Sequence, residues 1–247
     1  MKKIVLSIFL FILASMFIFN ACSSNVTTPA PAATPAPYVL PYSYYADDFE
    51  DGDLSCDIGT WGYVTDSSDG GNSTISDIAV VDGGANATSK ALSVTGNISA
   101  SAMSGGGYSA MVADTPIPTA VPTEAPYKGY ISAKLTLTKS SAGTDLTANS
   151  NMGFYMSYSS AGGAYTGKVV ITNNSNQSCS HSFAVTSSFN GHDLNFSSDF
   201  EVPSGAAYTV EDVIKTAKTI IFMAVLNSNT LGENYNTTLY VDELSFD

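Results

Sequence analysis

The stretch that decides the fold is Met152-Gly153-Phe154-Tyr155-Met156-Ser157-Tyr158. Its largest apolar side chains fall at every second position, namely Met152, Phe154, Met156 and Tyr158. Tyr155 and Ser157 stand between them. Because successive side chains of a strand point to opposite faces of a sheet, this pattern predicts a β-strand with one buried and one solvent-facing side. Sheets of this kind are typically antiparallel.

Similar segments recur along the chain between turns rich in Gly, Ser, Asn and Asp. Thr219–Leu226 differs, because nearly all of its residues are apolar, and we expect it to be covered on both faces. Many short strands separated by turns predict an all-β fold, a two-sheet antiparallel β-sandwich. The further strands that we expect are Ile78–Val81, Ala91–Thr95, Tyr108–Val112, Gly129–Thr138, Tyr165–Thr172, His181–Thr186 and Thr238–Phe246.

One short segment, Val210–Lys218, has the pattern of a helix. Thr209 can cap its first turn, where Glu211 and Asp212 suit the helix dipole. Its apolar stripe consists of Val210, Val213, Ile214 and Ala217. A Pro-rich stretch, Pro116–Pro126, is too long for a tight hairpin, so we expect an exposed loop, and long loops often border a binding site.

The N-terminus has the build of a secretory signal, since two lysines precede the apolar run Ile4–Phe19. The run ends in Phe19-Asn20-Ala21-Cys22, which resembles the lipobox of bacterial lipoproteins, although Leu is usual where Phe19 stands. The resemblance implies a signal peptide over residues 1–21 and lipid on Cys22. It also implies an exported protein, lipid-anchored to the bacterial membrane at the cell surface or the periplasmic face. An ordinary cleaved signal and an uncleaved anchor helix are the alternatives.

Residues 22–44 are expected to form a tether. The segment is rich in Pro, Ala, Ser and Thr, with prolines at 29, 31, 35, 37 and 41. Such a composition cannot bury a core and favours extended chain, at about 3 Å per residue. The folded domain is therefore expected over residues 45–247, a usual size for one sandwich.

Charge excludes one class of partner. Loss of Lys2 and Lys3 with the signal changes the formal charge from −13 to −15, and the chain has no Arg. Nucleic-acid phosphates demand basic patches, so nucleic acid is excluded as a partner. The absence of Arg also removes bidentate clamps for phosphate or carboxylate substrates. The oligomeric state is left open by the sequence.

Two cysteines remain once Cys22 is assigned to lipid. In an exported protein, Cys56 and Cys179 permit one disulfide, and two separate thiols are equally compatible with the sequence.

Five carboxylates crowd around Phe49: Asp47, Asp48, Glu50, Asp51 and Asp53. Such groups repel one another unless water or a cation screens them, and hard oxygen ligands suit Ca²⁺. An EF-hand does not fit, because placing Gly52 at the sixth loop position puts Phe49 and Ile58 where ligands are required. The spacing leaves a solvated strand end and a calcium site equally open.

Several motifs together resemble carbohydrate-binding module family 11 and its galactose-binding-like jelly-roll relatives. They span residues 45–247 in order: Asp47-Asp48-Phe49-Glu50-Asp51-Gly52, Trp61-Gly62-Tyr63, Asp69-Gly70-Gly71-Asn72-Ser73, Phe196-Ser197-Ser198-Asp199-Phe200 and Tyr240-Val241-Asp242-Glu243-Leu244-Ser245-Phe246. The resemblance implies a structural Ca²⁺ between the first and last strands, with Asp48, Glu50 and Asp242 as ligands and Asp47 as a neighbour. It also places Tyr63 and Tyr108 in a sugar cleft, with His181 or Phe183 near a further aromatic position.

Alternation alone adds Tyr155 and Tyr165 as sugar-contacting candidates, because a tyrosine offers a flat apolar body and a hydroxyl. The alternative for each tyrosine is structural packing. No motif for catalysis is present, neither His-Glu-x-x-His nor Gly-x-Ser-x-Gly, so we do not expect an enzyme.

The leading hypothesis is non-catalytic binding of a glucan-like polysaccharide by a membrane-anchored lipoprotein. The rival is a structural or protein-interaction surface lipoprotein with a degenerate sugar site. A concave face that carries Tyr63, Tyr108 and His181 together favours the first.

Overall fold

The structure is a computed structural model that describes residues 35–86, 88–101 and 127–247. Chain contacts divide the protein into two units, Met1–Thr34 and Pro35–Asp247. The signal peptide, Cys22, Tyr108 with its predicted strand, and the loop Pro116–Pro126 lie outside the described residues. None of the described helices is long and apolar enough to cross a membrane.

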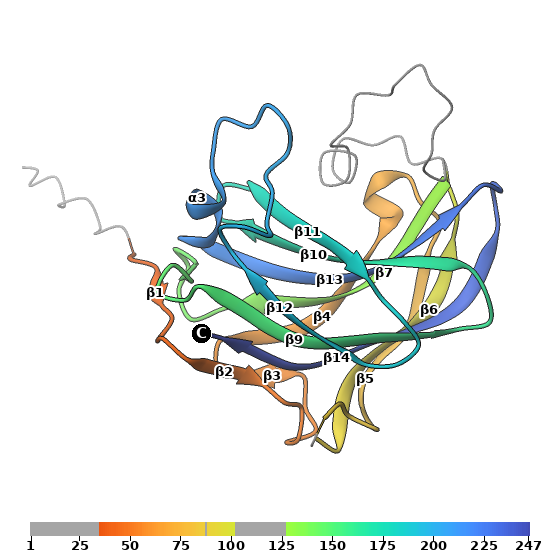
Figure 1. The fold of residues 1–247 in the computed structure, drawn as a ribbon, viewed down its shortest axis with the longest axis horizontal. Coiled ribbons are helices and arrows are strands. Elements are labelled where there is room, and N and C mark those ends of the chain that lie inside the picture. The colour runs from red at the N-terminus through yellow and green to blue at the C-terminus, as the bar shows by residue number, and fades with distance from the viewer. Residues whose placement is uncertain (1–34, 87, 102–126) are drawn as a thin grey trace, which may run out of the picture. The chain divides into compact units, whose positions relative to one another are not determined.

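The unit Pro35–Asp247 is built from two layers of strands (Figure 1). The first layer, sheet A, has six neighbouring strands with β8 and β1 attached at the end of β13. In spatial order they are β11 (Ser178–Ala184), β10 (Ala164–Asn173), β13 (Ala217–Ser228), β7 (Tyr127–Leu137), β4 (Gly59–Thr65) and β3 (Ser55–Cys56), followed by β8 (Thr144–Asp145) and β1 (Tyr38–Val39).

The second layer, sheet B, holds the strand predicted over Met152–Tyr158. The C-terminal strand β14 lies at its centre and pairs with β9 on one side and with β6, then β2, on the other. The order is β12 (Asn190–Asn195), β9 (Asn151–Ser160), β14 (Asn234–Phe246), β6 (Lys90–Ser99) and β5 (Thr74–Asp82), with β2 (Tyr44–Asp47) beside the last residues of β14. All pairings in this sheet are antiparallel.

The core lies between the sheets and confirms the apolar side predicted for β9, whereas Ser157, predicted on the solvent-facing side, is also buried. Met152, Phe154 and Met156 are at most 1% exposed. Phe154 meets Phe222 of sheet A edge to face, with ring centroids 4.9 Å apart, so this aromatic pair joins the two layers. The all-β two-sheet sandwich is therefore confirmed.

The predicted helix is real but shorter than expected. Helix α3 runs over Val210–Ile214 and begins with a capping box between Thr209 and Asp212. Ala217, which the apolar stripe included, belongs instead to β13, where it is fully buried and pairs with Thr144. The pairing of Ala217 with Thr144 thus ends the helix before the end of the predicted apolar stripe. A 3-10 turn, η1 (Asp66–Asp69), follows β4.

The folded unit also begins earlier than the predicted boundary at residue 45. Tyr38–Val39 pairs in parallel with Thr144–Asp145, and Leu40 is fully buried in the core. The last part of the expected tether is therefore part of the sandwich. Strands β4 and β12 were not predicted, because glycines and polar residues interrupt their apolar pattern.

The disulfide that the sequence permits between Cys56 and Cys179 is not formed. Cys56 and Cys179 are free thiols. They lie on β3 and β11, at opposite edges of sheet A, five strand spacings or about 24 Å apart. A disulfide joins Cα atoms that are only about 4.4–6.8 Å apart. Burial raises the pKa of the Cys179 thiol to about 12, so it stays protonated and inert.

Candidate ligand-binding groove

A hollow of about 240 Å³ crosses the outer face of sheet B. It spans four neighbouring strands, β12, β9, β14 and β2. We call it the Tyr45–Tyr155 groove; its lining residues are Tyr45, Gly153, Phe154, Tyr155, Gly191, His192, Asp193, Glu243 and Ser245. The strand register aligns these residues, because Gly191 stands opposite Tyr155 and Gly153 opposite both Asp193 and Ser245.

Two glycines form the floor of the groove. A Cβ atom on Gly191 would lie 3.1 Å from the ring of Tyr155, and one on Gly153 would lie 2.8 Å from the Ser245 hydroxyl. Both separations are tighter than ordinary packing, so any side chain there would displace its neighbour or fill the groove. The ring of Tyr155 can therefore lie close to the sheet beside Gly191.

Tyr45 stands on the opposite side of the groove, on β2, with 51% of its surface exposed. Burial of its hydroxyl, followed by the nearby carboxylates of Glu243 and Asp48, raises the pKa of Tyr45. The phenol therefore stays protonated, able both to donate and to accept a hydrogen bond.

Carboxylates supply the acceptors. Asp193 lines the β12 side, and Glu243 lies in an irregularity of β14 between Asp242 and Ser245. Glu243 has a φ of 49°, a conformation that non-glycine residues rarely adopt and that is concentrated at functional sites. Burial, and then the charge of Asp242, raises the pKa of Glu243. Two aromatic rings, a bare floor and two carboxylates can hold a flat, uncharged, hydroxyl-rich ligand.

The structure separates the residues that sequence reasoning grouped. Tyr155 alone among the described candidates lies in the groove. Tyr63, on β4 of sheet A, pairs with the core residue Ala133 and is 50% exposed, so it lies on the core side of that sheet's edge. His181 lies in the same cross-strand row, through Ala133, Phe222 and Val169, so it shares the core-facing side of sheet A with Tyr63 but stands at the opposite end, four strand spacings or about 19 Å away.

Tyr165 and His181 take structural positions. The hydroxyl of Tyr165 lies 2.9 Å from the Thr237 hydroxyl, and its ring packs 4.6 Å from that of Tyr158. His181 holds the backbone oxygen of Asp199 at 2.7 Å from its Nδ1. Packing, the alternative for a candidate tyrosine, applies to Tyr165.

Tyr45 was missed by the sequence analysis. Its signal was local, because Tyr44 and Tyr45 are adjacent in a strand and only one of them can face the core.

The acidic cluster itself divides into buried and exposed parts. Asp47 is 7% exposed, and its carboxylate accepts hydrogen bonds from the Phe49 amide at 2.9 Å and the Trp61 indole at 2.8 Å. Burial raises the pKa of Asp47 to about 6. Asp47 therefore fixes the turn after β2 to the core instead of facing a solvent-exposed ion.

Glu50 and Asp242 hold the connection between β5 and β6. Glu50 accepts the Ser89 amide at 2.6 Å and the Lys90 amide at 2.9 Å. Asp242 accepts the Ala85 amide at 2.7 Å and the Thr88 hydroxyl at 2.6 Å.

The Asp48 carboxylate instead accepts a hydrogen bond from the Glu50 amide at 3.1 Å. Within residues 35–86, 88–101 and 127–247, no three His, Cys, Asp or Glu side chains gather in a way that could hold a metal ion. The three predicted ligands are thus not assembled as one set.

Comparison with known proteins is limited to folds. No protein-family model matches the chain, and no curated protein matches it. Among solved structures, it is similar to the family 11 carbohydrate-binding module of the cellulosomal cellulase Lic26A-Cel5E of Clostridium thermocellum. The identity is 14%, the TM-score is 0.46, and the match covers 84% of this chain and 95% of that one.

Two further structures were solved with sugars bound. One is a Clostridium thermocellum family 11 module in complex with a β-1,3-1,4-mixed-linked tetrasaccharide, with 13% identity, a TM-score of 0.46, and coverage of 84% of this chain and 96% of that one. The other is TmCBM61 in complex with β-1,4-galactotriose, with 10% identity, a TM-score of 0.35, and coverage of 81% and 93%. Family 11 modules, which the sequence motifs resemble, are among the solved structures that are similar in fold to this chain.

Proposed function

We propose that this protein is a non-catalytic carbohydrate-binding protein whose ligand lies in the Tyr45–Tyr155 groove. The observation that carries the proposal is the pairing of two tyrosines with two carboxylates, Asp193 and Glu243, around a glycine floor. Tyrosine rings pack against the apolar faces of sugar rings, and carboxylates accept hydrogen bonds from sugar hydroxyls.

A neutral polysaccharide fits the charge of the chain. The formal charge of −13 and the two carboxylates of the groove disfavour an anionic glycan. We infer a glucan-like chain as the ligand. The tetrasaccharide and the galactotriose of the similar structures provide the first two soluble probes.

The test is affinity electrophoresis of residues 35–247, which form one compact unit, through gels that contain β-glucan, xylan, mannan or galactan. We expect retardation by at least one glycan and its loss in Tyr45→Ala. Tyr42→Ala is the matched control, because Tyr42 is 70% exposed and lies outside the groove. No retardation of the folded wild type by any glycan would refute the proposal, and release of reducing sugar would refute its non-catalytic part.

We also propose that lipid on Cys22 anchors this domain to a bacterial membrane after export. The lipobox-like sequence supports it. The test is detergent-phase partitioning of the full chain expressed with its signal. Wild type should enter the detergent phase and Cys22→Ser should not, whereas equal partitioning of both would contradict the anchor.

A structural Ca²⁺ at Glu50 and Asp242, with Asp48, is a further proposal. The donor chemistry supports it, because burial and then the charge of Glu50 raise the pKa of Asp242, and a cation relieves the repulsion between the two carboxylates. Against it stands the hydrogen bonding of both carboxylates to the β5–β6 connection. Thermal melting with Ca²⁺ and with EDTA tests this proposal. We expect a higher melting temperature with Ca²⁺, and an unchanged midpoint would refute the calcium site.

The scattering of the predicted aromatic set favours one rival. Tyr63, Tyr165 and His181 all lie on the core-facing side of sheet A, but core side chains separate Tyr63 from the other two, as expected for a protein-interaction lipoprotein with a degenerate sugar site. Intact lipid anchoring without retardation by any glycan would support that rival.

A further inference from the structure

A second hollow, of about 270 Å³, opens where α3 meets the end of sheet B. We call it the α3 pocket; its walls include Thr147, Asn149, Ser150, Phe196, Val210 and Ile214. It shares no lining residue with the Tyr45–Tyr155 groove. Phe196 belongs to the Phe-Ser-Ser-Asp-Phe motif, for which the groove provides no role.

Asn149 is the unusual residue of this pocket. Its side chain is 4% exposed, yet within the described part of the chain neither its Nδ2 nor its Oδ1 has a hydrogen-bond partner. Only its backbone amide is satisfied, by the Leu146 oxygen at 3.0 Å. Buried polar groups in folded proteins are almost always paired, so a side-chain amide with both ends open calls for a partner from outside the chain.

The walls of the pocket are held by backbone hydrogen bonds. The Leu146 amide donates to the Ile214 oxygen of α3 at 3.0 Å, and the Phe196 amide donates to the Ser150 oxygen at 2.9 Å. The Ser150 amide donates in turn to the Asp247 oxygen at 2.6 Å. The loop that carries Asn149 is therefore fixed to the helix on one side and to sheet B on the other, so the pocket is preformed, and the buried amide atoms reach a ligand there by a turn of the Asn149 side chain.

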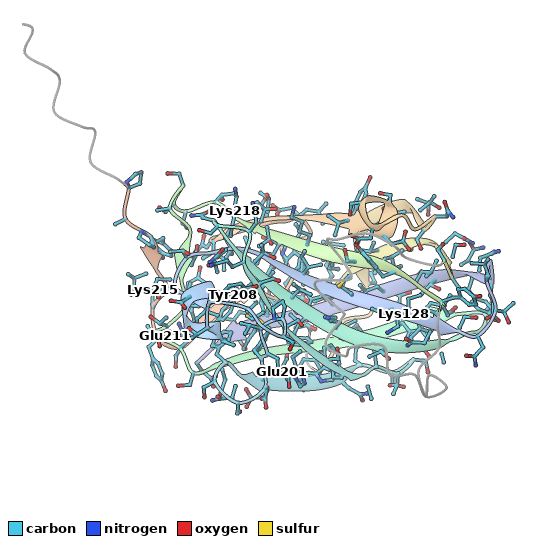
Figure 2. The ribbon with its side chains drawn as sticks, turned by 90° about the horizontal axis from the view of Figure 1, so that it is seen from above. Lys128, Glu201, Tyr208, Glu211, Lys215 and Lys218 are labelled. Atoms are coloured by element: carbon cyan, nitrogen blue, oxygen red, sulfur yellow. The ribbon has the colours of Figure 1, made fainter. Side chains whose placement is uncertain are left out.

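The chemistry of the lining selects the ligand. A carboxamide donates from Nδ2 and accepts at Oδ1, and two neighbouring hydroxyls satisfy both, since one accepts and the other donates. Phe196, Val210 and Ile214 provide apolar surface beside it. Glu211, which lies at the α3 end of the sandwich near Lys215 (Figure 2), is the only charged side chain among the described lining residues, and it disfavours anions.

We propose that the α3 pocket binds one neutral sugar unit through a vicinal pair of hydroxyls held by the Asn149 amide. The site stands on its own residues and is independent of binding in the groove. A pocket of this size also admits several waters, which could satisfy the same amide. The experiment must therefore separate sugar from water.

The test is an NMR titration of residues 35–247 with glucose, galactose, mannose and xylose. We expect saturable shifts of the Asn149 side-chain NH₂ signal and of the Phe196 and Ile214 amides for at least one sugar. In Asn149→Leu, which keeps the volume and removes the amide, those shifts should be lost while the fold is kept. Asn236→Leu, an exposed asparagine on β14 outside both sites, should retain them.

Three results would overturn the proposal. The first is the absence of shifts with every sugar, which would mean that water alone fills the pocket. The second is equal shifts in Asn149→Leu. The third is shifts confined to Tyr155 and Gly191, which would support the groove and reject the pocket. Shifts at Asn149 that persist in Tyr45→Ala would support the pocket as a sugar site that does not depend on the groove.

Discussion

The outer faces of the two sheets differ sharply. Sheet A carries an apolar cluster there, formed by Tyr130, Val170, Ile221, Met223 and Val225, each at most 8% exposed. Sheet B carries the Tyr45–Tyr155 groove, with glycines, tyrosines and carboxylates. The strands of the two sheets face the same core, so the contrast lies entirely in the residues between the core positions. These intervening residues decide which face of this sandwich can meet a polar ligand.

The largest expected effect breaks the contrast by placing charge on the buried outer face. Val170→Asp puts a carboxylate at a fully buried position and should lower the free energy of unfolding by about 3 kcal/mol or more, because a buried charge without a partner is strongly destabilising. Ser159→Asp, at an exposed position of β9, should change it by less than about 0.5 kcal/mol. Urea unfolding measures both, and equal effects would show that the two faces do not differ.

The second effect tests which face binds. Tyr155→Ala removes a wall of the groove and should weaken glycan binding at least about tenfold, or ~1.4 kcal/mol. Tyr63→Ala removes a half-exposed tyrosine from the edge of sheet A and should leave the dissociation constant unchanged. Isothermal titration with the best-retarding glycan measures both variants. The reverse order of effects would move the site to sheet A.

The third effect concerns pH and the inner side of sheet B. His192 stacks on Phe154, and its Nε2 is buried with no partner among the described residues. Burial, and then the nearby His181, lowers the pKa of His192. Between the unfolded pKa of about 6.5 and the lower folded one, the unfolded chain binds the extra proton. The stability of the fold should therefore decline as the pH falls below about 6.5.

His192→Phe should flatten this decline. Urea midpoints measured on both sides of that pH, for wild type and variant, give the two slopes. Identical slopes would assign the pH dependence to other groups.

The smallest effect sharpens the role of the groove floor. Gly191→Ala places a methyl group 3.1 Å from the Tyr155 ring, so the ring must move by a few tenths of an ångström. Binding should weaken a few-fold, with the free energy of unfolding changed by no more than about 0.5 kcal/mol. Gly62→Ala is the matched control, because a methyl group there meets nothing within 4 Å. Unchanged binding in Gly191→Ala would show that the Gly191 floor is not part of the binding site.

The sequence carried much of the fold. The alternation of β9 and the continuous apolar run of β13 predicted one half-buried strand and one strand covered on both faces, and Val225 at 4% and Leu226 at 0% exposure agree with the latter. Helix α3 was shortened because the pairing of Ala217 with Thr144 outweighs an apolar stripe. Local patterns state which side of a segment is apolar, whereas the element that forms depends on the partner strand.

The candidate site was less predictable for the same reason. The groove depends on register, which sets Gly191 beside Tyr155 and Tyr45 beside Ser245 across distant parts of the chain. Spacing in the sequence does not contain that register. Similarly, nothing in the sequence marks Asn149 as an open amide, because its missing partners are known only once the surrounding loop and helix are in place.

The position of strand β2 has a consequence for how force would pass through the domain. The strand follows the segment through which the chain enters the folded unit, pairs with the last residues of β14, and carries Tyr45 at the rim of the groove. A pull between an anchored N-terminus and a captured glycan would therefore load a path only a few residues long. The parallel pair of Tyr38–Val39 with Thr144–Asp145 would bear the force first, and then the antiparallel ladder between Tyr44–Asp47 and Leu244–Phe246.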